Sequence, residues 1–458
     1  MRKKIDVSPS FPLLVTNCEL KVVADYQKKY DRMSELLDVN PGILNAFHGD
    51  LRNWGSDDGR ESSYSSEQFL RMLIVKCLEG LSFRDVVVRV SDSAILRNFT
   101  RLFSGDVMNF TVLNTAFKLV SPTTWDTIKD VLFRYARNEG KISGDRLRLD
   151  STVCESNIHY PTDASLLWDS FRTAERLMSQ CREADLRLDM GNRFHVAKIK
   201  QLYTFIATHG GQKRKGTQRK VRAFTRTLID RTDWICGVSR EFIAHGETVS
   251  TGIEAWALLT ELKRVLPLME HVVLQARRAF NGETVPASER IFSIFEPHTE
   301  LLMRGKAHKP VEFGHMVSIG QTAEKFISFC KVEEKSRHDR VIGDEAREDH
   351  KKKFGAYPAE FTADKNYYGG PEHTEKWEER IKVYSVGKKG KRNEQETERE
   401  HSYLFKLLQK FRAGCEGSIS VLKRIFGLRR CLNRGFTSFG SAIGCLVFCH
   451  NLVVLSKL

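Results

Sequence analysis

The chain has 458 residues, and its 73 Lys and Arg exceed its 58 Asp and Glu to leave a formal charge of +15. An excess of this size indicates a polyanionic partner. The sequence is 41% hydrophobic and contains 28 Phe and 6 Trp, which excludes a disordered chain. At about 150 residues per domain, the length predicts roughly three structural units.

Neither a membrane span nor a secretory segment is expected. The longest apolar stretch, residues 443–455, is interrupted by His450 and Asn451. The ten cysteines include no CxxC pair, so free thiols in a reducing cytoplasm are predicted. Cys445, Cys449 and His450 come nearest to a metal-binding pattern, but their neighbours form an apolar helical run. Buried core cysteines are therefore predicted there, and no zinc site is assigned.

Residues 1–140 are predicted to form a helical N-terminal DNA-binding domain. The pattern Ser65-x-x-Gln68 is typical of a capping box that opens a helix, and Gly80 ends that helix. The pattern Ser82-x-x-Asp85 then begins a second helix. Two short helices joined by a tight turn are compatible with a helix-turn-helix DNA reader and with an ordinary helical hairpin, and the sequence leaves both open.

The periodicity changes to that of a strand at Arg146. Leu147 and Leu149 alternate with Arg148 and Asp150, so Asp150 faces away from the leucines, and we expect it near the strand's end. A second strand is predicted over residues 359–364 and ends in Asp364. Further strands are predicted at 310–319 and 325–332, as a hairpin, and at 381–386, which makes the chain α/β.

Residues 161–281 return to a helical pattern and are predicted to form a large helical insertion. A basic segment within it has six cations and no acid over residues 212–222. These basic side chains either form a solvent-exposed helix face or contact phosphate groups. The positive charge of the whole chain favours contact with phosphate. Contact with DNA is accordingly predicted for Lys213, Arg214, Lys215, Arg219 and Lys220, with Arg222 as the sixth cation.

Glu416 is the one acid among nine basic residues in the last 58 residues. It is flanked by Gly414 and Gly417 in a helical pattern, where glycine is costly unless a backbone or ligand must approach closely. Helical spacing places Arg412 and Lys423 on the same face as Glu416.

Asp150, Asp364 and Glu416 are predicted to converge at the carboxyl edge of a sheet. Three carboxylates suit Mg²⁺ or Mn²⁺, and two such ions can support an in-line phosphoryl displacement without a protein nucleophile. Spacing alone leaves open that the aspartates are only capping or turn residues.

Four sequence runs resemble bacterial insertion-sequence DDE transposases, most closely the ISNCY type, over residues 64 to the end. They are Leu149-Asp150-Ser151-Thr152-Val153 continuing to Asp163, Phe295 to Glu300 with Gly305 to Gly314, Ala363-Asp364-Lys365-x-Tyr367, and Arg412-x3-Glu416-x6-Lys423 continuing to Arg430. His308 and Lys309 also match a family motif, with no role assigned.

The resemblance implies an RNase H-like mixed sheet, formed by residues 141–160 and 282–458, that carries the DDE catalytic domain. It implies that Asp150, Asp364 and Glu416 are the catalytic and metal-binding triad for two Mg²⁺ or Mn²⁺ ions. It further implies that Arg412 and Lys423 contact DNA near the scissile phosphate. The tyrosine of the family signature is Gln409 here.

The implied activity is divalent-metal-dependent cleavage at transposon ends followed by strand transfer into target DNA. The implied partners are double-stranded DNA, as terminal inverted repeats and as target, and further copies of the chain in a homodimer or larger oligomer. A bacterial cytoplasmic location at the nucleoid is expected. The alternatives are a metal-dependent DNA nuclease and an inactive DNA-binding relic, whereas a recombinase with a nucleophilic hydroxyl is disfavoured because the motifs centre on carboxylates.

Overall fold

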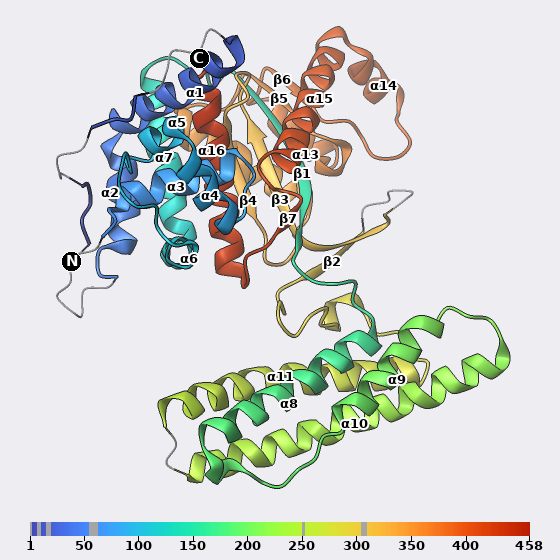
Figure 1. The fold of residues 1–458 in the computed structure, drawn as a ribbon. Coiled ribbons are helices and arrows are strands. Elements are labelled where there is room, and N and C mark those ends of the chain that lie inside the picture. The colour runs from blue at the N-terminus through green and yellow to red at the C-terminus, as the bar shows by residue number, and fades with distance from the viewer. Residues whose placement is uncertain (1, 7–10, 15–19, 55–62, 250–251, 304–308) are drawn as a thin grey trace. The chain divides into compact units, whose positions relative to one another are not determined.

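The computed structural model describes residues 2–6, 11–14, 20–54, 63–249, 252–303 and 309–458. Over these residues the chain is mixed α/β and contains a mixed sheet of seven strands. It divides into two compact units, one formed by residues 1–155 and 315–458 and the other by residues 156–314. Figure 1 labels the elements of both.

The first unit begins with helices, as the sequence predicted. Their bounds are α1 (Lys21–Asp38), α2 (Pro41–Leu51), α3 (Ser66–Leu78), α4 (Phe83–Asp92), α5 (Ala94–Phe99), α6 (Phe110–Leu119) and α7 (Pro122–Asn138). The predicted capping box is present, because Ser65 and Gln68 each accept a hydrogen bond from the other's backbone N–H. Ser82 caps α4 by accepting from the Asp85 N–H, and Gly80 between the helices has φ +63°.

The sheet contains the predicted strands and two short ones that the sequence did not indicate, β2 and β7. The strands are β1 (Arg146–Ser156), β2 (Glu300–Met303), β3 (Val311–Gln321), β4 (Ile327–Val332), β5 (Glu360–Thr362), β6 (Val383–Ser385) and β7 (Arg430–Cys431). The main path runs β2-β3-β1-β5-β6, with β4 paired to β3 and β7 to β1. β1, β5 and β6 are parallel, and β3 with β4 is the predicted antiparallel hairpin.

Helices complete this unit after β4. They are α12 (Asp339–Phe354), the 3-10 turn η3 (Lys365–Tyr367), α13 (Pro371–Glu378), α14 (Glu394–His401), α15 (Tyr403–Arg424) and α16 (Phe436–Leu455). Pro371 opens α13, since proline suits the first helical position.

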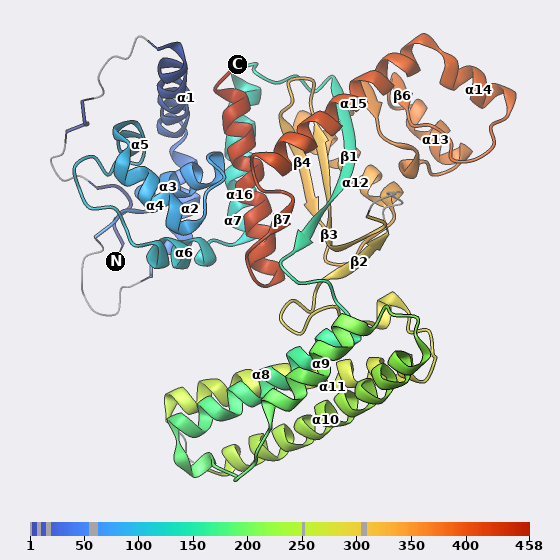
Figure 2. The same ribbon diagram turned by 45° about the vertical axis from the view of Figure 1, so that its right-hand side comes forward.

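Successive side chains of β1 point to opposite faces of the sheet and contact different helices. Leu147 and Leu149 are buried in one cluster with Ile342 and Ala346 of α12. Arg148 points to the opposite face, where it contacts Phe411 of α15. Figure 2 shows α12 on one side of the sheet and α16 with α7 on the other. Asp150, two residues beyond Arg148, therefore lies on the face covered by α15.

Among the described residues, α16 is the one helix whose length and composition would allow it to cross a membrane. Of its most apolar window, 72% is buried inside the protein. Its side chains pack against α7 and α3, and against β3 and β4 through a cluster that includes Ile443 and Val317. This burial is typical of a core helix.

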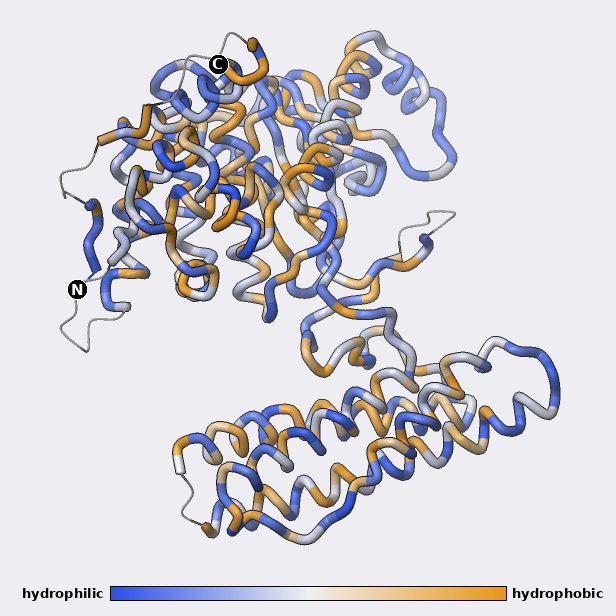
Figure 3. The backbone as a smooth tube through the Cα atoms, in the orientation of Figure 1, coloured by the Kyte–Doolittle hydropathy of each residue, from blue (hydrophilic) through white to orange (hydrophobic). Residues whose placement is uncertain are grey.

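Within the described residues, the second unit contains four helices, and its range also includes β2 and the start of β3. The helices are α8 (Asp163–Ala184), α9 (Val196–His209), α10 (Lys215–Thr248) and α11 (Ile253–Phe280), with the 3-10 turns η1 (Leu186–Leu188) and η2 (Ala287–Glu289). Phe171, Leu228 and Leu262 belong to the core that α8, α10 and α11 share. Hydrophobic and hydrophilic residues alternate along the helices in Figure 3, as expected of amphipathic helices, and the turn between α9 and α10 is hydrophilic.

Candidate active site

Asp150 lies on β1, and Asp364 lies just beyond the end of the neighbouring parallel strand β5. The last registered pair of β1 and β5 is Arg148 with Thr362, and each aspartate is two residues further along its chain. The prediction that Asp150 ends its strand is wrong, because β1 continues to Ser156. The strand continues because β3 and β7 supply further backbone partners, such as Arg429, whose carbonyl accepts from the Glu155 N–H. Asp150 instead marks the point where β1 and β5 separate.

Asp364 lies two residues after the end of β5 and caps the short turn η3. Its Oδ1 accepts a hydrogen bond of 2.8 Å from the Asn366 N–H, and its Oδ2 accepts one of 3.2 Å from Asn366 Nδ2. The carboxylate is only partly buried. The capping bonds therefore orient a carboxylate that solvent still reaches.

Glu416 enters from α15, and Arg412 one turn earlier connects it to Asp150. Arg412 Nη2 lies 3.2 Å from Glu416 Oε1, and Arg412 Nη1 lies 3.7 Å from Asp150 Oδ2. The Glu416 side chain is 61% exposed, whereas that of Asp150 is 15% exposed. One guanidinium thus stands between two of the three predicted carboxylates.

The electrostatics of Asp150 bring the third carboxylate into the same site. The pKa of Asp150 is raised to about 6, chiefly by burial and in addition by the negative charges of Asp364 and Glu416. The Ser151 N–H, which donates to Asp150 Oδ1 at 2.8 Å, and Arg412 act in the opposite direction. Because two neighbouring negative charges disfavour the ionised form of Asp150, added positive charge beside it would be favourable.

Three hydroxyl groups near Asp150 in the fold belong to residues for which the sequence predicted no role. The Tyr367 hydroxyl forms a short hydrogen bond with Ser151 Oγ, and Ser151 Oγ lies 3.0 Å from Ser318 Oγ. Burial holds the pKa of Tyr367 well above its usual range, so this hydroxyl stays protonated. Tyr367 belongs to the motif around Asp364, but only the fold shows that it links η3 to β1 next to Asp150.

Gln409, at the position of the family tyrosine, holds α15 against the ends of β5 and β6. Its Nε2 donates to the Ser385 carbonyl at 2.8 Å and to Ser385 Oγ at 3.0 Å, and lies 3.3 Å from Thr362 Oγ1. Its Oε1 accepts from Arg412 Nε at 3.3 Å. The carboxamide therefore positions the helix and the arginine.

Arg148 joins the sheet to α15 beneath the site. It donates to the Phe411 carbonyl at 3.0 Å and to Gln321 Oε1 at 3.1 and 3.3 Å, and its side chain is almost fully buried. A Cβ at Gly414 would stand 2.2 Å from Arg148 Nη1, whereas a Cβ at Gly417 would meet nothing within 4 Å. The close approach expected at the paired glycines is therefore found at Gly414 alone.

The other predicted site residues lie elsewhere on their elements. Lys423 is near the end of α15, about two turns after Glu416, and is half-buried. The basic segment belongs to the second unit, where Lys213 and Arg214 precede α10 and the remaining four cations lie in its first turns. All six of these residues are exposed. Arg222 stacks over Phe280 at 4.9 Å. His308 falls outside the described residues.

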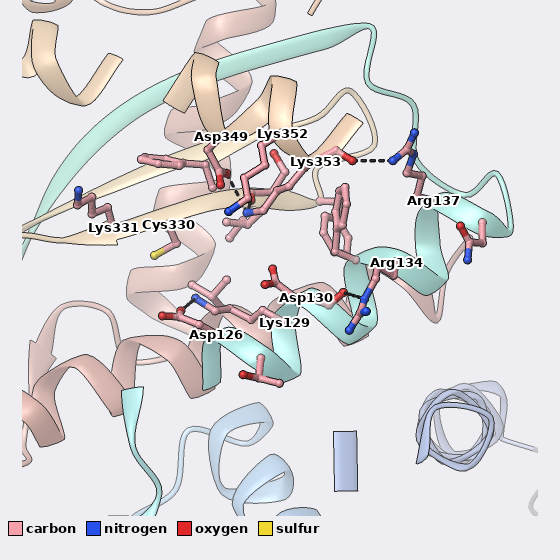
Figure 4. A pocket seen from close by; sticks show the side chains of 18 residues that line it. Asp126, Lys129, Asp130, Arg134, Arg137, Cys330, Lys331, Asp349, Lys352 and Lys353 are labelled. Carbon is pink, nitrogen blue, oxygen red and sulfur yellow. Dashed lines mark hydrogen bonds and ion pairs between the residues drawn. The ribbon is translucent and has the colours of Figure 1, made fainter. Parts of the chain in front are cut away.

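A cavity of about 870 Å³ lies apart from the three carboxylates, between α7, β4 and α12 (Figure 4). Several of its cations serve the packing of these elements. Lys129 pairs with Asp126 at 2.7 Å, and Lys353 donates to the Ser328 carbonyl at 2.6 Å. Arg137 donates to the Lys353 carbonyl at 2.7 Å. The size of this cavity therefore does not identify the active site.

A protein-family model matches the helical first part of the chain. Residues 19–119 match the model, which is described as a transposase domain of unknown function 772, and this segment contains α1 to α6 and ends with the last residue of α6. No curated protein and no solved structure matches the chain. The matched segment ends before β1, so Asp150, Asp364 and Glu416 lie outside it.

Proposed function

We propose that the protein is a DDE transposase of the ISNCY type with an RNase H-like core, which cleaves DNA at transposon ends and joins the ends to target DNA. The transposase domain at residues 19–119 suggests transposase function. The observation that carries the proposed chemistry is that Arg412 lies between Asp150 and Glu416, while Asp364 is close enough to raise the pKa of Asp150.

The donor set fits divalent metal ions. Asp150, Asp364 and Glu416 offer hard carboxylate oxygens, which Mg²⁺ and Mn²⁺ prefer. Arg412 offsets part of the negative charge of Asp150 and Glu416, and burial together with the neighbouring carboxylates still raises the pKa of Asp150. Two bound ions would activate the attacking oxygen and stabilise the leaving oxygen of the phosphodiester.

The chain's own residues then bind and orient the DNA. With ions held by Asp150 and Glu416, Arg412 would be free to bind the scissile phosphate, because its guanidinium fork suits phosphate as well as carboxylate. Gln409 and Arg148 keep α15 seated on the sheet, so that Glu416 stays within reach of Asp150. In the first step water attacks the phosphorus and the 3′ oxygen leaves as a hydroxyl; in the second step that hydroxyl attacks a target phosphorus and releases a target 3′ oxygen.

The basic segment at the start of α10 is a second DNA contact in this proposal. Cations at the N-terminus of a helix oppose its macrodipole, so they do not serve the stability of α10. Contact with DNA phosphates would offset this unfavourable interaction with the helix dipole. It would also make DNA binding strongly dependent on salt concentration. The proposal includes terminal repeats and target as duplex partners, an oligomer of the chain on DNA, and a bacterial nucleoid location.

The test is cleavage and joining of a duplex that carries the element's own end, with Mg²⁺ or Mn²⁺. We expect Asp364→Asn to lose 3′-end nicking and joining while it still binds DNA. Glu375→Gln, which neutralises an exposed carboxylate on α13, is the matched control and should keep both activities. Nicking without joining would favour the metal-dependent nuclease. Wild-type protein that binds the end but neither cuts nor joins would favour the DNA-binding relic.

A further inference from the structure

Three thiols that are far apart in the sequence meet in the core of the first unit. Cys77 lies near the end of α3, and Cys445 and Cys449 lie one turn apart on α16. Their three sulfur atoms all lie within 4.8 Å of one another. The sequence pattern grouped Cys445 and Cys449 with His450, because nothing in the spacing points to Cys77. The fold replaces the histidine with a third thiol.

The three thiols interact with one another in a way that favours one thiolate. Hydrogen bonds from Cys445 and Cys449 lower the pKa of the Cys77 thiol. Burial and the charge of Cys77 raise the pKa of Cys449, which is fully buried. Lys76, adjacent to Cys77, supplies a positive charge that favours the thiolate form of Cys77. A cation that displaces the remaining protons would meet preassembled sulfur ligands.

The composition of the group determines which cation it suits. Within the part of the chain that the structure describes, the mutually close ligand atoms are these three sulfurs, without a fourth histidine, cysteine or carboxylate. Thiolates are soft ligands that select Cu(I), zinc and iron–sulfur clusters. Structural zinc almost always has four protein ligands, and iron–sulfur clusters are usually held by four cysteines. Three sulfurs in an apolar core therefore fit a soft monovalent ion best.

We propose that Cys77, Cys445 and Cys449 form a three-sulfur site for one soft, thiophilic metal ion of the Cu(I) class. Binding replaces the thiol protons with three metal–sulfur bonds and releases those protons to solvent, with no change in oxidation state. The ion ties α3, which lies within the segment matched as a transposase domain, to the C-terminal helix α16. This inference is independent of the proposed DNA chemistry.

The test is an anaerobic titration of the reduced full-length chain with Cu(I) in competition with a chelator of known Cu(I) affinity. We expect one ion per chain to be held against the chelator. Cys77→Ala and Cys449→Ala should each lower the Cu(I) affinity by roughly a hundredfold or more. Loss of a residue that only hydrogen-bonds to a metal ligand can already lower metal affinity by about that factor. Cys236→Ala removes a buried cysteine of α10 that is outside the group and should leave the affinity unchanged.

Because Cys449 is fully buried, its variant could fail for lack of folding. Cys77 is only half-buried, so Cys77→Ala tests the site with the smaller disturbance, and circular dichroism of each variant without metal checks the fold. Hydrogen exchange gives a second readout: loading should slow the exchange of α3 and α16 and leave α8 unchanged. Equal Cu(I) affinity in all three variants would overturn the proposal. It would also be overturned if Cys77 formed a disulfide in the purified protein and the reduced protein then bound no ion.

Discussion

Gly414 lies directly against the guanidinium of Arg148, and a single added carbon at this position would stand 2.2 Å from Arg148 Nη1. Arg148 cannot simply swing away, because Gln321 and the Phe411 carbonyl hold it in a buried position. This close approach sets how near α15 comes to β1, and therefore how near Glu416 comes to Asp150.

The two glycines of α15 should respond oppositely to alanine. Gly414→Ala forces a buried arginine out of its hydrogen bonds, and we expect it to lower the free energy of unfolding by about 1–3 kcal/mol, as overpacking does. Gly417→Ala adds a methyl group in open space on the helix and should raise it by up to about 1 kcal/mol. Urea denaturation of both variants checks this pair. Equal stabilisation by both would show that Arg148 yields without cost.

The stability of the metal-free protein should depend on pH through Asp150. Its pKa is about 6 in the folded chain, raised from an ordinary value of 3.8, so the folded state binds the proton more tightly than the unfolded state does. The free energy of unfolding therefore falls as pH rises from about 4 to about 6, by at most about 3 kcal/mol from this group. Asp150→Asn removes this decrease and should be more stable than wild type at pH 8 but not at pH 4. An equal difference at both pH values would contradict the assignment.

Gln409 should matter for stability and not for DNA charge contacts. Gln409→Leu removes one hydrogen-bond donor to the Ser385 carbonyl, which still accepts a hydrogen bond from Thr362 Oγ1. We therefore expect the free energy of unfolding to fall by only about 1 kcal/mol. The salt dependence of DNA binding should stay as in the wild type. Lys410→Ala, at the exposed neighbouring position, is the control for stability. If Gln409→Leu left the stability unchanged but weakened DNA binding, position 409 would contact DNA, as the resemblance implies for the tyrosine of the family signature.

The basic segment should contribute to the salt dependence of DNA affinity. Reversing the charge of Lys215 and Arg219 should reduce the slope of log affinity against log salt by roughly 0.9 for each phosphate that the segment no longer neutralises. The same change at Lys198 and Lys200, two exposed lysines of α9, is the matched control. Equal effects of both double variants would mean that only the overall charge matters, and fluorescence anisotropy over a salt series distinguishes the outcomes.

Much of the local structure followed from local patterns in the sequence. The capping box at Ser65 and Gln68 works through bonds within one helical turn, and the alternation of Leu147 with Arg148 follows from the pleat of a strand. The hairpin of β3 and β4 and the helical character of residues 161–281 were predicted for the same reason. The length of β1 was not, because β3 and β7 extend it through pairing with distant residues.

The sequence by itself determined which residue types are present for chemistry, namely carboxylates, a basic helix and ten cysteines, because composition and periodicity are properties of the chain alone. The tertiary structure decided which of them meet. It placed Arg412 between Asp150 and Glu416, assigned Gln409 to the strand ends and brought Cys77 to Cys445 and Cys449. These relationships depend on how α3, α15 and α16 pack against elements tens to hundreds of residues away, and packing at that separation leaves no periodic signal in the sequence.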